Sequence, residues 1–294
     1  MKKILFFLFL SFFLGFKAQE NERWLKLGPY KTAVLNDSLR ENSGLAFFKN
    51  RLFTINDSGN SSDLFEIEKT SGKISNTLKT NLKNIDWEAI TSDSSAIYIG
   101  DFGNNGGTRK DLKIYKIELD SALKTLSSNS AQEILFFYPE QKDFISKNLN
   151  TDFDAEAMIF LNGKIHIFTK EWASKATTHY TINPANSVIQ PAVKIETFPT
   201  DYVVTDATYF RGTLYLIGYT KKTDVFLSVF RESKPGIFFE QKPQKYYLGT
   251  ALAIGQIEGI AADELGIYIS GEQFKSPFGK VKPNLYFVPH SNLQ

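Results

Sequence analysis

The sequence predicts an all-β protein made of a repeated sheet unit, and three observations support this prediction. A short motif, in most copies an acidic residue directly before a small residue, recurs along the chain. A second apolar run follows each copy after about eight or nine residues. Helical periodicity is almost absent, whereas short runs rich in Ile, Val, Tyr, Phe and Thr alternate with turn signals. Such a recurring unit indicates a repeated β architecture.

The motif occurs five times, and in one copy Ser replaces the acid. The copies lie at residues 41–45, 86–90, 154–158, 204–208 and 256–260. The spacings between equivalent positions are 45, 68, 50 and 52 residues, and we expect the long one to absorb an insertion within residues 140–152.

Each of the first four copies begins a unit that reads as four short strands. After the motif, the later strands are predicted at 52–55, 64–67 and 73–80; at 97–99, 112–117 and 133–138; at 164–168, 178–182 and 188–197; and at 214–217, 225–230 and 236–239. Four strands per repeat are typical of a β-propeller blade. We therefore predict a β-propeller with five blades of four-stranded antiparallel sheets. A sixth, degenerate blade in the longest interval is the main alternative, and two β-sandwich domains are a third.

The last unit is one strand short. It offers strands at 267–269 and 285–288 after its motif, and then the chain ends. A spare strand at residues 24–27 precedes the first motif, so we expect the N-terminal strand to complete the last blade and close the ring.

The first residues are typical of an export signal. Positions 2 and 3 are lysines, and an apolar run follows at residues 4–16. This run is shorter than the roughly 20 residues that a membrane helix needs. We expect residues 1–18 to be a signal peptide and residues 19–294 to be a single propeller domain. The protein is then exported, either to the periplasm or out of the cell, with no integral membrane segment after cleavage, and we expect a monomer.

Composition excludes several classes of function. The chain has no Cys, which excludes disulfides, thiolate metal sites and a cysteine nucleophile. It has 34 basic and 32 acidic residues, and the basic residues are scattered, so nothing indicates nucleic-acid binding. There is also no Gly-x-Ser-x-Gly sequence of a serine hydrolase.

Aligning the motifs produces a column of mostly acidic residues. The column contains Ser43, Glu88, Glu156, Asp206 and Glu258, and a second column two residues earlier contains Glu41, Asp86, Asp154, Val204 and Gln256. Residues two apart on a strand share a side. Because the innermost strands of a propeller line its central channel, up to seven carboxylates are expected to converge there.

Converging carboxylates repel one another and require a cation, a proton or a basic partner. Oxygen ligands suit a hard cation, so we expect calcium first and magnesium second. The candidate metal ligands are Glu88, Glu156, Asp206, Glu258, Asp86, Asp154 and Glu41. The structural alternative is that each acid caps backbone N–H groups of a neighbouring blade.

A further set of charged residues follows the second strand of the units. The candidate ligand-binding residues of this rim are Asp57, Asp101, Arg109, Lys170, Glu171 and Glu272. Loops at strand ends on a rigid scaffold are common binding sites. The alternative is that these are ordinary exposed loop charges.

Four segments carry a resemblance to known proteins. They are residues 41–45 (ENSGL), 54–60 (TINDSGN), 86–90 (DWEAI) and 98–104 (YIGDFGN). The chain resembles exported propellers of the SdiA-regulated and phytase-esterase-like groups. This resemblance implies a propeller with calcium in or above the channel, and an esterase or phosphatase activity.

The sequence leaves three functions open. The first is binding of a metal ion, and through it of a small or polymeric ligand, at the channel mouth. The second is a metal-dependent phosphoesterase or esterase with Glu88 or Glu156 as general base. The third is a scaffold that binds protein partners.

Overall fold

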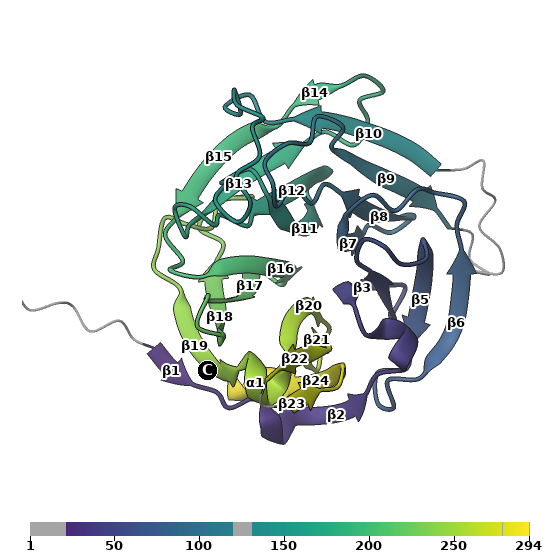
Figure 1. The fold of residues 1–294 in the computed structure, drawn as a ribbon, viewed down its shortest axis with the longest axis vertical. Helices are drawn as coiled ribbons and strands as arrows, with labels where there is room; N and C mark the ends of the chain where they lie inside the picture. The colour runs from purple at the N-terminus through teal and green to yellow at the C-terminus, as the bar shows by residue number, and fades with distance from the viewer. Residues whose placement is uncertain (1–21, 120–130, 278, 294) are drawn as a thin grey trace, which may run out of the picture.

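Five four-stranded antiparallel sheets form a closed ring in the computed structural model of the protein (Figure 1). The structure describes residues 22–119, 131–277 and 279–293. The predicted signal peptide therefore lies outside the described residues. No helix among the described residues is long and apolar enough to cross a membrane. The five-bladed β-propeller is confirmed, and the alternatives of six blades and of two sandwiches are wrong.

The first three blades follow the predicted strand order. Blade 1 consists of β3 (Asn42–Phe48), β4 (Arg51–Asn56), β5 (Asp63–Ile67) and β6 (Ile74–Lys79). Blade 2 consists of β7 (Trp87–Ser92), β8 (Ala96–Asp101), β9 (Lys113–Glu118) and β10 (Ala131–Phe137), with the short β14 (Gln190–Pro191) added in parallel at its edge. Blade 3 consists of β11 (Ala155–Leu161), β12 (Lys164–Thr169), β13 (Thr177–Ile182) and β15 (Val193–Phe198).

Blade 4 differs from the prediction in its outer strand. It consists of β16 (Val203–Phe210), β17 (Thr213–Tyr219), β18 (Asp224–Arg231) and β19 (Gln244–Thr250). The predicted strand at 236–239 is wrong. That segment lies in the connection between β18 and β19, where Lys234 and Ile237 form only an isolated bridge.

The N-terminal segment closes the ring, as predicted, but with a later strand. Blade 5 consists of β20 (Gln256–Ala262), β21 (Gly266–Glu272), β24 (Asn284–Pro289) and, at its outer edge, β2 (Lys31–Val34). The predicted closing strand at 24–27 instead runs beside blade 4, where β1 (Glu22–Trp24) pairs in parallel with β19. Leu25 and Leu27 continue this contact, donating backbone hydrogen bonds to Tyr247 and Leu248.

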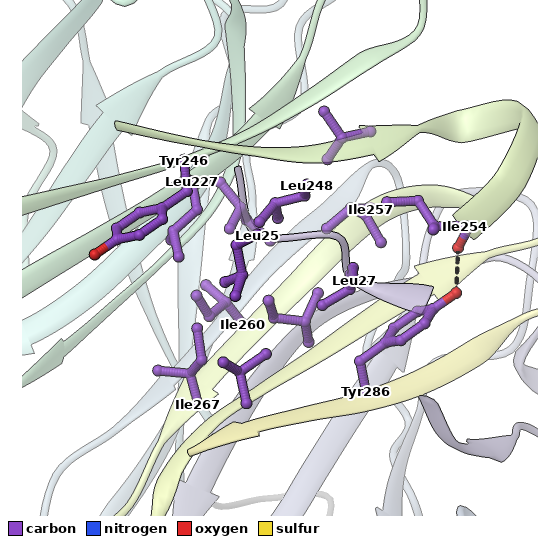
Figure 2. Packing of buried hydrophobic residues seen from close by; sticks show 14 of the residues in the cluster. Leu25, Leu27, Leu227, Tyr246, Leu248, Ile254, Ile257, Ile260, Ile267 and Tyr286 are labelled. Carbon is purple, nitrogen blue, oxygen red and sulfur yellow. Dashed lines mark hydrogen bonds between the residues drawn. The ribbon is translucent and has the colours of Figure 1, made fainter. Parts of the chain in front are cut away.

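The apolar core is divided among the blade interfaces. Each of the five clusters of buried side chains joins two neighbouring blades. Figure 2 shows the one between blades 4 and 5, where Leu25 and Leu27 lie among strand residues of both blades. The Tyr286 hydroxyl there donates a 2.8 Å hydrogen bond to the carbonyl of Ile254, in the short helix α1 (Ala251–Ile254). The N-terminal segment therefore packs into the interface between blades 4 and 5 before β2 closes the ring in blade 5.

All five innermost strands carry an irregularity at the same point. The pairing with the second strand of the blade skips one residue in each of β3, β7, β11, β16 and β20. The skipped residues are Gly44, Glu88, Glu156, Thr205 and Glu258. A bulge of this kind re-aims the side chain of the extra residue. The repeated motif thus encodes a bulge at one end of the channel.

Candidate functional site

A cavity of about 690 Å³ opens at the end of the channel where the inner strands begin. A smaller cavity of about 120 Å³ lies at the opposite end, and the two share no lining residue. Between them, Asp206 on β16 hydrogen-bonds to backbone groups of β3 and β20. The larger cavity therefore lies at one mouth of the propeller, and we call it the mouth cavity.

Five carboxylates from four blades line the mouth cavity. They are Asp57, Glu88, Glu156, Glu258 and Glu272. Three of these, Glu88, Glu156 and Glu258, are the bulged residues of their inner strands. Asp57 and Glu272 come from the ends of the second strands of blades 1 and 5. Both the predicted inner column and the predicted rim thus contribute to one site.

Three acids lie close enough together to share one cation. Carboxylate oxygens of Asp57, Asp86 and Glu88 all lie within 4.8 Å of one another. At such a distance two carboxylates repel each other by roughly 3 kcal/mol at an effective dielectric constant of about 20. Burial is the main cause that raises the pKa of Asp57 and of Asp86. We call these three residues the carboxylate cluster.

The backbone at Asp86 and Gly103 leaves space for the carboxylate cluster. The amide of Asp86 donates to Asp101 Oδ1 at 3.1 Å, and the amide of Gly103 donates to the carbonyl of Asp86 at 3.2 Å. A Cβ atom on Gly103 would overlap the carboxylates of Asp86 and Glu88. A glycine at this position therefore leaves the space that the two acids occupy.

Glu88 is the most unusual member of the carboxylate cluster. Its side chain is only 4% exposed, and among the described residues its carboxylate has no hydrogen-bond or ion-pair partner. Burial, followed by the negative charges of Glu156, Asp57 and Asp86, holds the pKa of Glu88 well above its usual range. A buried carboxylate without partners is costly unless a proton or a cation compensates it.

Lys170 is the buried cation of the mouth cavity. Its ammonium group pairs with Glu156 Oε1, and it lies 5.4 Å and 5.5 Å from the ring centroids of Trp172 and Tyr219. Although burial lowers it, the pKa of Lys170 stays well above its usual value because Glu156 and neighbouring acids favour the charged form. The second oxygen of Glu156, Oε2, is buried without a partner among the described residues.

Glu258 and Glu272 form the blade 5 side of the cavity. Gln256 Nε2 donates a 2.6 Å hydrogen bond to Glu258 Oε1. Burial, then the negative charges of Glu258 and Asp57, raises the pKa of Glu272 to about 9. Counting Lys170 and Lys221 against the five lining acids, the cavity carries a formal excess of negative charge.

Asp206 belongs to a different environment from the rest of its predicted column. In blade 4 the bulged residue is Thr205 and not Asp206. In blade 1 it is Gly44 and not Ser43. The alignment of motifs is therefore one residue out of register in these two blades. Asp206 accepts hydrogen bonds from the amides of Ala207, Leu45 and Ile260, and it does not line the mouth cavity.

Three other predicted residues hold the loops around the cavity without lining it. Asp154 Oδ1 accepts from the amides of Asn104 and Ala155, so it ties blade 3 to the loop after β8. Asp101 is fully buried and pairs with Arg109 at 3.0 Å. Arg109 also donates to the carbonyls of Gly103 and Asp101, which fixes the loop that carries Gly103.

The last two predicted residues also lie outside the cavity lining. Glu171 accepts hydrogen bonds from the hydroxyls of Thr169 and Ser174, within its own blade. Glu41 is about half exposed and accepts a 2.7 Å hydrogen bond from Asn60 Nδ2. Capping of backbone N–H groups in another blade therefore describes Asp206 and Asp154. Asp101 and Glu171 are buried and are not ordinary exposed loop charges.

Several lining residues were not candidates from the sequence. They are neutral polar or apolar residues from loops or strand ends: Asn42, Asn105, Asn148, Leu149, Thr220, Thr223 and Phe274. Asn148 and Leu149 belong to the predicted insertion, whose backbone bonds to Gly106 and Asn105 fold it over the mouth. No sequence signal marks these residues, because their position depends on how long loops fold back.

Comparisons with known proteins identify no family for the chain. No family model and no curated protein matches the chain. Solved structures with a similar course include a chain of hydrazine synthase from Kuenenia stuttgartiensis, with 10% identity, a TM-score of 0.41, and coverage of 88% of this chain and 66% of that one. A putative 6-phosphogluconolactonase from Bacteroides uniformis has 12% identity, a TM-score of 0.39, and coverage of 88% and 72%. A putative glucose dehydrogenase from Thermus thermophilus has 9% identity, a TM-score of 0.46, and coverage of 86% and 98%.

Proposed function

We propose that the protein binds one divalent cation, calcium, at the carboxylate cluster of Asp57, Asp86 and Glu88, and binds a small or polymeric ligand in the mouth cavity beside it. The observation that carries this proposal is the buried carboxylate of Glu88, which lies within 4.8 Å of two other acids and has no partner among the described residues. Residues 1–18 support the accompanying proposal that the protein is exported.

The chemistry of the donors favours calcium over a transition metal. All three groups offer carboxylate oxygens, and the chain contains no Cys. Ca²⁺ takes about six to eight oxygen ligands in a flexible geometry, whereas Mg²⁺ demands a nearly ideal octahedron. A cluster that draws Asp57 from the loop after β4, Asp86 from the residue before β7 and Glu88 from β7 itself suits the more tolerant ion.

Calcium is expected to stabilise the folded protein. A ligand that binds only the native state adds RT ln(1 + [L]/Kd), which is about 2.7 kcal/mol at a hundredfold excess over Kd. The measurement is the melting temperature in chelator and in increasing calcium, with magnesium in parallel. A melting temperature that changes with neither chelator nor calcium contradicts the proposal.

A metal-dependent hydrolase of esters or phosphoesters is the second candidate. Glu156 favours it, because its Oε2 is buried and unpartnered among the described residues while the side chain lines the cavity that holds Glu88. A general base needs an oxygen that accepts no other hydrogen bond. Calcium-dependent turnover that is lost in a folded Glu156→Gln variant would establish the enzyme, and no turnover across an ester and phosphoester screen would leave only the binding protein.

A further inference from the structure

A second hollow adjoins the mouth cavity. This hollow has a volume of about 250 Å³ and lies where blades 3 and 4 meet. It shares Trp172, Tyr219, Thr220 and Lys221 with the mouth cavity. The two hollows therefore adjoin, and together we call them the trench, with the mouth cavity as its inner lobe and the second hollow as its outer lobe.

The inner lobe offers neutral hydrogen-bonding groups besides its acids. Amide and hydroxyl side chains that line it are Asn42, Ser43, Asn105, Asn148, Gln256, Thr220 and Thr223. Asn42 is 1% exposed, and its Oδ1 atom is buried without a partner among the described residues. Amide groups and hydroxyls at an otherwise built site suit a ligand rich in hydroxyl groups, because each ligand hydroxyl both donates and accepts.

The outer lobe has the opposite balance of charge. Lys175, Lys221 and Lys222 line it, against the two acids Asp201 and Asp224. All three lysines are exposed, and no ion pair joins any of them to another described residue. Lys221 lies 5.5 Å from the ring centroid of Trp172, which places its charge at the junction of the two lobes.

We propose that the trench binds an acidic oligosaccharide, a chain of sugars that carry carboxylates. Sugar hydroxyls then meet the amides of the inner lobe, while carboxylates farther along the chain meet Lys221 and Lys222 in the outer lobe. This inference rests on the proposed function, because the cation at the carboxylate cluster reduces the negative charge of the inner lobe and so lets an anionic ligand approach it.

The test compares ligands of equal length and different charge. Calorimetric titration in calcium uses a hexamer of galacturonic acid, the same hexamer with its carboxylates methyl-esterified, and inorganic polyphosphate. We expect saturable binding of the acidic hexamer, at least tenfold weaker binding of the neutral ester, and weakening with added salt because exposed charges are screened. Tighter binding of polyphosphate, or equal binding of both hexamers, overturns the carboxylate assignment.

Two variants locate the binding site. The double variant Lys221→Ala and Lys222→Ala removes two outer-lobe charges from an exposed turn, and we expect about tenfold weaker binding of the acidic hexamer. Lys73→Ala, which changes an exposed lysine in the turn between β5 and β6, is the matched control and should bind like the wild type. Equal affinity of the double variant and the wild type overturns the proposal.

The two proposals fail in distinguishable ways. Calcium stabilisation without binding of any hexamer overturns the ligand assignment and leaves the cation site intact. Absence of calcium stabilisation together with absence of binding overturns both. Binding of the acidic hexamer that persists in chelator overturns the requirement for the cation.

Discussion

Glu88 and Asp206 are both buried acids near the start of an inner strand, yet their surroundings differ completely. Glu88 is 4% exposed and Asp206 is fully buried, and burial raises the pKa of each. Asp206 accepts three backbone hydrogen bonds, whereas the carboxylate of Glu88 has no partner among the described residues. Residue type, burial and pKa therefore do not separate a structural acid from a binding acid. The hydrogen bonds that each carboxylate accepts do distinguish the two kinds of acid.

The largest effect is expected from removing the structural acid. Asp206→Ala leaves the amides of Leu45, Ile260 and Ala207 without their acceptor, and each buried unsatisfied group costs about 1–3 kcal/mol. We expect a loss of about 4 kcal/mol in the free energy of unfolding, measured by urea denaturation. Asp206→Asn keeps one acceptor and should lose less. A loss below about 1 kcal/mol for the alanine variant would show that Asp206 is not structural.

A second buried hydrogen-bond network is expected to make stability depend on pH. In blade 3, His166 Nδ1 lies 2.7 Å from His179 Nε2, and His179 Nδ1 lies 3.1 Å from Glu196 Oε1. Glu196 in turn accepts from the amides of Phe238 and Phe239, in the connection between β18 and β19 of blade 4. Burial, followed by the neighbouring His179, lowers the pKa of His166 to about 4, and the hydrogen bond to the carbonyl of Leu161 opposes this shift.

We expect this network to contribute less to the stability of the folded protein in acid. Because the folded pKa of His166 lies below the unfolded value of about 6.5, its contribution is present above pH 6.5 and is lost as pH falls toward 4, by about 3 kcal/mol in total. The measurement is urea denaturation of the wild type and of His166→Leu between pH 7 and pH 4. Effects of the mouth carboxyls are common to both proteins and cancel in the difference. An equal pH dependence of the two proteins would contradict the assignment.

The smallest effect on stability is expected from the binding acid. Without calcium, Glu88→Gln removes a carboxyl group whose ionised form is opposed by burial and by the negative charges of Glu156, Asp57 and Asp86, and it breaks no hydrogen bond among the described residues. We expect the free energy of unfolding in chelator to rise by about 1 kcal/mol, which is opposite in sign to the effect at Asp206. If Glu88→Gln destabilises the protein by more than about 1 kcal/mol in chelator, Glu88 is also a structural acid.

The fold was predictable because each blade buries its strands against two neighbours. That burial requires alternating apolar residues in the inner three strands of every blade, and the sequence shows them. The outer strand of blade 4 was placed at 236–239 instead of Gln244–Thr250 because outer strands have fewer buried positions and a weaker pattern. The closing strand was predicted at 24–27 instead of Lys31–Val34 for the same reason, because β2 is mostly exposed.

The site was predictable in part. The alignment found Glu88, Glu156 and Glu258 because the bulge recurs at the same motif position in blades 2, 3 and 5. It misplaced Ser43 and Asp206 because a bulge shifts the register by one residue, and the sequence does not show which residue is extra. Asp57 was found as a rim residue, but its approach to Asp86 and Glu88 depends on contact between blades 1 and 2 that only the folded ring defines.

The most direct test of the cation site is the stoichiometry of calcium binding, measured by isothermal titration of chelator-treated protein. Wild type is expected to bind one calcium ion per chain, Glu88→Gln to bind at least tenfold more weakly, and Glu118→Gln, which changes an exposed acid on β9, to bind like the wild type. Unchanged calcium binding in Glu88→Gln, or no saturable binding by the wild type, would contradict the account.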